Sequence, residues 1–239
     1  MATHYSTNYT DISQITGPSG WYGIKTPEGT AVTYIDQEYD GGGWALVMAN
    51  RINTDGMKDT NYNETINQCH LRTGTTSVRS SFHGASGLSN YNYMMGLKFW
   101  QYFGGRETAN KITVVQYVSP SIVALGSTGS HTKRYRWQFD GFNGTYAHTG
   151  VASVSDETGT GAPGYYAYHA ANGYSLTTYD NDQDIAGNNC STYYGNHPFW
   201  FGSCWSGNVW GSTTGTHADA YFWNGSTSDY HNYGAVYIR

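Results

Sequence analysis

Three carboxylates at alternate positions mark one short segment of this chain, the run from Tyr179 to Cys190. Asp180, Asp182 and Asp184 lie among Asn, Gln and Gly residues, which favour turns and loops. Like charges packed so closely repel one another unless a cation neutralises them. Oxygen ligands on a loop suit a hard ion, and Ca²⁺ is the usual one. The run therefore predicts an irregular, calcium-binding loop that orders the aromatic segment following it.

The spacing of these carboxylates resembles an EF-hand loop only at its start. Counted from Asp180, the sixth position needs Gly and holds Ile185, and the twelfth needs a bidentate Glu and holds Ser191. The sequence therefore excludes an EF-hand and indicates a non-helical acidic loop. The alternative interpretation is a solvated turn without a metal ion, because Asp and Asn are common in turns.

The composition indicates a binding protein rather than a helical bundle or a Rossmann-type enzyme. The chain of 239 residues has 31 Gly and 23 Tyr, and only 12% of it is charged. Tyr and Trp offer large contact areas at low entropic cost, which suits recognition. A net charge of −5 gives no nucleic-acid footprint, and no apolar run is long enough for membrane insertion. Residues 1–5 lack the charged and apolar regions of a signal peptide.

Alternating and apolar runs predict strands joined by glycine-rich turns, within a single domain. A bend is expected at Gly41–Gly43, followed by a core position at Trp44, and the strand at 111–118 should pair with the one at 134–139. A short helix is expected within 91–103, ended by Gly104 and Gly105. Periodicity is largely lost after residue 150. The other expected strands are 21–24, 30–35, 44–49 and 235–238.

Three cysteines are present, at Cys69, Cys190 and Cys204. A bridge between Cys190 and Cys204 would close a short loop around aromatic residues and contribute about 3 kcal/mol through the unfolded state. Cys69 is then left over, either as a buried or free thiol or as a partner in an intermolecular bond.

An ordered series of motifs runs from about residue 18 to residue 239: Ser19–Pro27, Asp40–Trp44 with Val47 and Arg51, Tyr93–Leu97, Thr178–Asp184, Phe199–Phe201 before Cys204, and Asn208–Gly211. This series resembles the fibrinogen-like C-terminal domain, which is shared by fibrinogen chains, ficolins, angiopoietins and tachylectin-type lectins. The resemblance implies an α+β fold, with a twisted antiparallel central sheet, short helices and a loop-rich, calcium-stabilised C-terminal binding subdomain. Residues 1–17 would be an N-terminal extension, about 18–150 the sheet-rich part, and about 151–239 the part that binds calcium and ligand.

The resemblance also implies which residues form the sites. Calcium would be held by the carboxylates of Asp182 and Asp184 and by the backbone carbonyls of Ala186 and Asn188, with Asp180 outside the ligand set. A disulfide would join Cys190 to Cys204. The pocket for the ligand would be formed by Tyr194, Cys204, Trp205, Trp223 and Tyr230. The sequence departs from the pattern at Ile35, which replaces a cysteine of an N-terminal disulfide, and at Trp205, which replaces a common histidine.

These assignments lead to one main functional hypothesis and two alternatives. The main one is a calcium-supported lectin module for carbohydrates or acetyl groups, working as a homo-oligomer that recognises glycans or acetylated ligands on a cell surface. Its setting would be an adhesin or a viral or phage receptor-binding tip, on the virion surface or secreted. One alternative is a protein-binding module that docks a receptor or peptide. The other is an enzyme, which we do not expect because adjacent residues such as Asp156 and Glu157 point oppositely in an extended segment.

Overall fold

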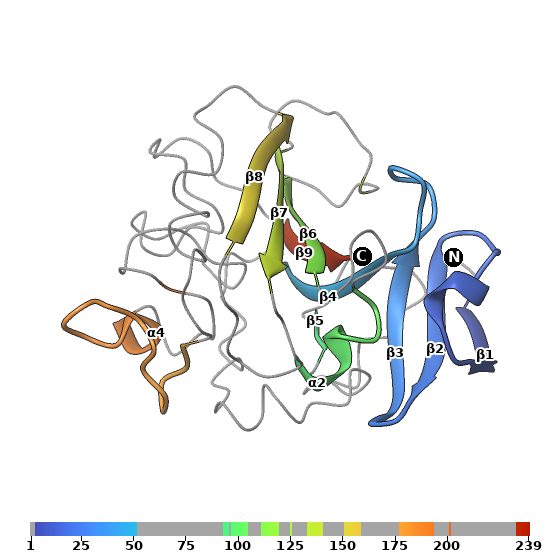
Figure 1. Cartoon of the computed structure of the whole chain (residues 1–239), viewed down its shortest axis with the longest axis horizontal. Helices are drawn as coiled ribbons and strands as arrows, with labels where there is room; N and C mark the ends of the chain where they lie inside the picture. Colours follow the sequence, from blue (N-terminus) through green and yellow to red (C-terminus); the bar gives the residue numbers. More distant parts are fainter. Residues whose placement is uncertain are drawn as a thin grey trace.

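The computed structural model describes the strands and the acidic loop of this chain (Figure 1). The described residues are 3–51, 93–95, 97–104, 111–119, 125, 133–140, 151–158, 177–193, 201 and 233–239. In chain order the elements are β1 (Thr3–Tyr9), the 3-10 helix η1 (Ile12–Gln14), β2 (Gly20–Thr26), β3 (Gly29–Asp36), β4 (Trp44–Arg51), β5 (Tyr93–Met94), α2 (Leu97–Trp100), β6 (Lys111–Ser119), β7 (Lys133–Asp140), β8 (Val151–Thr158), α4 (Cys190–Tyr193) and β9 (Tyr233–Ile238). Within these residues no helix is long and apolar enough to cross a membrane.

The described strands form a nine-stranded sheet in the order β1-β2-β3-β4-β9-β6-β7-β8, with β5 beside β4. Its strand pairs are antiparallel apart from β1 and β2 at one edge, which run parallel. The expected antiparallel sheet is therefore confirmed, with one parallel pair added. Strand β9, which follows all the others in the sequence, lies between β4 and β6 (Figure 1).

The predicted pairing of residues 111–118 with 134–139 is confirmed. In the β6–β7 pair, Ile112 lies opposite Phe139 and Val114 opposite Trp137. The same two β7 positions face Val151 and Val154 of β8 on the other side. Apolar and aromatic residues thus occupy matching positions across three strands, an arrangement that stabilises antiparallel sheets.

Among the described residues, the core includes the central strands β4 and β9 and the region of helix α2. Strand β9 is buried from Ala235 to Ile238, and β4 is buried from Trp44 to Val47. Continuous burial is expected for strands that are covered on both faces. The largest fully buried side chains are Trp44, Trp100, Tyr22, Phe99 and Phe103.

The helix expected within 91–103 is much shorter than that range. Residues Tyr93–Met94 pair with β4 as β5, and the Met95 N–H donates to the Val47 carbonyl at 2.8 Å. Strand pairing therefore uses backbone groups that a helix would need. The four-residue helix α2 starts at Leu97, and its last turn closes through Gly104 N–H to the Trp100 carbonyl at 2.9 Å.

Three regular elements were not expected from the sequence. Strand β1 and helix η1 lie within residues 1–17, and β8 lies just after residue 150, where sequence periodicity is weak. A capping box starts η1: Asp11 Oδ1 accepts from Ser13 N–H at 2.6 Å, and Gln14 Oε1 accepts from Asp11 N–H at 3.3 Å.

Candidate functional site

The acidic loop, residues 177–193, begins with a tight turn that uses Asp180. Thr178 and Asn181 exchange backbone hydrogen bonds of 3.0 and 3.2 Å across Tyr179 and Asp180. Asp180 Oδ1 accepts from the Thr178 hydroxyl at 2.7 Å. This carboxylate therefore takes part in closing the turn.

Asp184 ties the loop to helix α4. Its Oδ1 accepts from Ala186 N–H at 2.9 Å, and its Oδ2 accepts from Cys190 N–H at 2.8 Å, at the first residue of the helix. Asp182 is exposed, and its Oδ1 accepts from Asp184 N–H at 3.2 Å. The position of α4 thus depends directly on the Asp184 carboxylate.

The electrostatics of Asp184 fit a site for a cation. Partial burial of the carboxyl group raises the pKa of Asp184, and the neighbouring Asp182 carboxylate raises it further. The hydrogen bonds from Cys190 and Ala186 act in the opposite direction. A carboxylate offers about four lone-pair sites, so both side chains keep acceptor capacity beyond the hydrogen bonds described above. Two adjacent carboxylates with remaining lone pairs form a donor set of the kind that Ca²⁺ takes.

Within the described residues, no group of three or more His, Cys, Asp or Glu side chains is gathered around a point that could hold a metal ion. The expected calcium site has only two carboxylates, completed by the carbonyls of Ala186 and Asn188. Its assignment therefore stays a prediction.

The loop is also held by bonds that need no ion. Gln183 N–H donates to Thr177 Oγ1 at 3.1 Å, and the Asn189 amide donates to the Thr178 carbonyl at 2.9 Å. Thr177 and Thr178 are fully buried. These contacts join both ends of the loop, so an ion would add to an existing framework.

Cys190 is fully buried at the start of α4. Cys204 lies outside the described residues, so its pairing with Cys190 stays a prediction. The other expected pocket residues also lie outside them: Tyr194, Trp205, Trp223 and Tyr230. Ile185 and Tyr179 of the loop are exposed by 68% and 39%.

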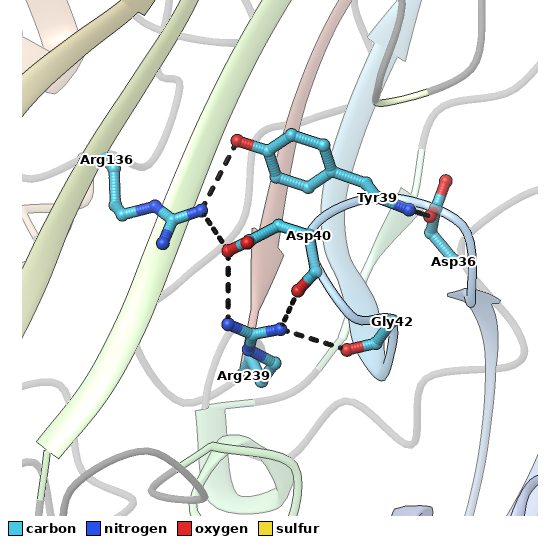
Figure 2. A network of polar contacts seen from close by, with 6 residues as sticks. All are labelled: Asp36, Tyr39, Asp40, Gly42, Arg136 and Arg239. Carbon is cyan, nitrogen blue, oxygen red and sulfur yellow. Dashed lines mark hydrogen bonds and ion pairs between the residues drawn. The ribbon is translucent and has the colours of Figure 1, made fainter.

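A second polar site lies at the bend between β3 and β4 (Figure 2). The expected bend at Gly41–Gly43 and the buried position of Trp44 are confirmed. The sequence did not indicate that Arg136 of β7 and Arg239 after β9 both reach this bend. We call the four side chains of Asp40, Trp44, Arg136 and Arg239 the arginine cluster.

Both arginines of the cluster bind the same carboxylate oxygen. Arg136 Nη2 lies 2.6 Å and Arg239 Nη2 lies 3.3 Å from Asp40 Oδ2. The hydrogen bond from Arg136 is the main reason that the pKa of Asp40 is lowered. Both guanidinium groups also lie over Trp44, with Cζ 5.2 Å from the ring centroid for Arg136 and 4.4 Å for Arg239. The cluster thus joins β4, β7 and the end of β9.

Asp36 fixes the start of the same bend. Its Oδ1 accepts from the N–H groups of Glu38 and Tyr39 at 3.0 and 2.8 Å. Burial raises the pKa of this carboxyl group, and hydrogen bonds from the backbone of Glu38 and Leu125 lower it. The bend is therefore set by side-chain to backbone bonds as well as by glycine.

The fold is that of known fibrinogen-like domains. It is similar to the fibrinogen-like globe domain of human ANGPTL6, with a TM-score of 0.66 and 17% sequence identity, covering 100% of this chain and 98% of that one. The corresponding domain of human ANGPTL2 gives a TM-score of 0.66 and 16% identity, covering 97% of this chain and 98% of that chain. A scan against protein-family models and a search of curated proteins each found no match.

A third similar structure is lamprey fibrin D-dimer in complex with the peptide Gly-His-Arg-Pro-amide. Its TM-score is 0.61 at 12% identity, covering 96% of this chain and 72% of that one. At these identities the likeness establishes the fold. The chain therefore has the fibrinogen-like fold, and the resemblance of its motifs to fibrinogen-like domains is confirmed at that level.

Proposed function

We propose that this chain is a calcium-supported lectin module that binds carbohydrates or acetyl groups. The observation that supports this most directly is the position of Asp184. Its carboxylate lies beside that of Asp182 and also accepts the backbone N–H of Cys190 at 2.8 Å. An ion at the two carboxylates would thus act on the segment that leads into the expected pocket.

In this proposal the ion is held by Asp182, Asp184 and the carbonyls of Ala186 and Asn188. Bound Ca²⁺ supplies positive charge that offsets the repulsion between the two carboxylates. The chain's own part is to orient α4 through the Asp184–Cys190 bond and to keep the loop closed through Asn189. We propose that Cys190 pairs with Cys204 and so borders the pocket.

Ligand recognition would fall to the aromatic residues Tyr194, Trp205, Trp223 and Tyr230. Aromatic faces suit an acetyl methyl group or the C–H face of a sugar ring, and the backbone near Cys204 offers donors for a carbonyl oxygen. One small contact binds weakly, so we propose a homo-oligomer that gains affinity through several sites. We propose that the chain belongs to a secreted adhesin or to a viral or phage receptor-binding tip at the virion surface, because such proteins bind cell surfaces through several sites.

The calcium site is tested by isothermal titration with CaCl₂ and by thermal melts with calcium and with chelator. Replacing Asp182 by Asn should lower calcium affinity at least tenfold, because it removes a ligand while keeping the side-chain size. The matched control is Asp180→Asn in the same loop, which should change affinity only a few-fold. Equal losses in both variants, or no calcium binding by the native chain, would contradict the assignment.

The second candidate is a protein-binding module without lectin activity. It is favoured by one comparison, the lamprey fibrin D-dimer that was solved with a bound peptide. A glycan array read with calcium and with chelator, beside binding measurements on Gly-His-Arg-Pro-amide, separates the two. Binding to peptide and to no sugar would favour the second candidate.

We propose no catalytic role for this chain. Asp156 and Glu157 are adjacent residues of strand β8. Successive positions of an extended strand alternate between its two faces, so this pair is unsuited to flanking one glycosidic bond. Turnover of a glycoside in a standard assay would contradict this.

A further inference from the structure

We propose that the bend of residues 39–44 is a binding site for a guanidinium group, occupied from within the chain by Arg239. The site would select guanidinium over ammonium. Its occupation would hold strand β9, which ends directly before Arg239, against the bend.

The edge of the Arg239 guanidinium faces three oxygen acceptors (Figure 2). Nη1 donates to the carbonyl oxygen of Asp40 and, at 3.2 Å, to that of Gly42. Nη2 donates to Asp40 Oδ2 at 3.3 Å. Because two nitrogens of one planar group are used, the arrangement matches the fork of a guanidinium better than the single nitrogen of an ammonium group.

The flat face of the same group lies on a buried aromatic ring. Arg239 Cζ is 4.4 Å from the centroid of Trp44, whose side chain is fully buried. The Tyr39 ring lies beside Trp44 at 5.6 Å between centroids. Cation–π contacts strengthen as solvent is excluded. The bend thus provides an aromatic ring for the flat face of the guanidinium and oxygen acceptors for its edge.

The acceptors are fixed by the bend itself, without help from Arg239. Asp40 has φ 42°, and Gly41, Gly42 and Gly43 have φ 80°, 75° and 75°, so four consecutive residues are left-handed. Their conformation is held by Gly42 N–H to the Tyr39 carbonyl at 2.8 Å and by Gly43 N–H to Gln37 Oε1 at 2.9 Å. The site should therefore persist when the Arg239 side chain is removed.

Charge explains why a cation from solution would not enter while Arg239 is in place. Arg136 Nη2 already donates to Asp40 Oδ2 at 2.6 Å and to Tyr39 Oη at 3.4 Å. The two arginines and Asp40 together carry one net positive charge. A further cation would meet repulsion from both arginines, so the site becomes available only when Arg239 is replaced.

The experiment uses chemical rescue of the full-length Arg239→Ala variant. Thermal melts are recorded with ethylguanidinium or with ethylammonium at the same ionic strength, for the variant and the native chain. At about twice its dissociation constant, ethylguanidinium should raise the Tm of the variant by about 2 °C. It should not raise the Tm of the native chain, and ethylammonium should raise neither. Equal effects of the two cations, or equal effects on both proteins, would overturn the proposal.

A second variant tests whether the rescue uses the proposed acceptors. Adding Asp40→Asn to Arg239→Ala removes the carboxylate charge, and Asn tolerates the positive φ at this position. Rescue should then be lost, and its persistence would overturn the proposal. Should Arg239→Ala fail to fold alone, its refolding yield in the two cations replaces the melt. A higher yield with ethylguanidinium supports the site, and equal yields refute it.

Discussion

Gly42 is the position at which one added methyl group should disturb the bend most. A Cβ built there would lie 2.6 Å from Gln37 Oε1, 2.8 Å from the Gln37 carbonyl oxygen and 3.0 Å from Gln37 Cα. Two of these atoms belong to the backbone and cannot rotate away. Gly42 also has φ 75°, a conformation that costs an L-residue about 1–2 kcal/mol.

The decrease in the free energy of unfolding expected for Gly42→Ala follows from these contacts. The left-handed backbone contributes about 1–2 kcal/mol, offset by about 0.5 kcal/mol of lost unfolded-state entropy. The clash displaces Gln37, whose side chain joins the Ile15 carbonyl at 2.8 Å to Gly43 N–H at 2.9 Å. Those two bonds are worth about 1 kcal/mol each. We expect the free energy of unfolding to fall by about 3 kcal/mol.

Gly41→Ala is the matched control for this substitution. Gly41 has a similar φ of 80°, but among the described residues its added Cβ would meet only Arg239 Nη1, at 3.6 Å. Its cost should therefore be the backbone part alone, about 1 kcal/mol. Urea denaturation of both variants measures the difference. Equal losses in Gly41→Ala and Gly42→Ala would refute the argument from Gln37.

Three further predictions concern other parts of the described structure. Replacing Arg239 by Met should lower the free energy of unfolding by about 2 kcal/mol, because it removes the contact with buried Trp44 and a bond to the Gly42 carbonyl. The ion pair of Arg239 with half-exposed Asp40 adds little to this loss. A decrease in the free energy of unfolding below about 0.5 kcal/mol, measured in urea, would contradict the prediction. Burial raises the pKa of Tyr34 to about 12 from 10.0, so the neutral phenol stabilises the fold below pH 10 and this contribution is lost as the pH rises through 12. The loss should reach about 3 kcal/mol, and Tyr34→Phe, compared by denaturation from pH 9 to 12, should abolish this part of the pH dependence. Asp11→Ala should cost about 1 kcal/mol by removing the cap of η1, and unchanged urea midpoints would argue against that role.

The parts of the fold that could be predicted are those in which local pattern and environment agree. Apolar and alternating runs predict β6 and β7 and their pairing, and a glycine triplet before an apolar run predicts the bend and the buried Trp44. The acidic loop was predicted as irregular, and its residues 177–189 contain no helix or strand beyond the Thr178–Asn181 bridge.

The rest depended on contacts between distant residues. Arg136 and Arg239 are separated from Asp40 by 96 and 199 positions, and no local pattern connects them. Strand β8 has little periodicity of its own and is defined by pairing with β7. Helix α2 is short because the residues before it pair with β4. In each case contacts between distant residues determined the structure, because the local sequence preference did not specify it.

The central position of β9 has a consequence for how the chain reaches its native state. Among the described strands, β9 alone pairs with both β4 and β6, so it joins the two halves of the sheet. Ribosomal synthesis makes residues 233–238 after every strand that flanks them. The sheet therefore cannot close until β9 has been made, because Ala45 of β4 pairs with Ile238. Such non-local pairing predicts slow folding. The edges of β4 and β6 that bind β9 stay unpaired until β9 inserts, and aggregation is the greatest hazard during that interval.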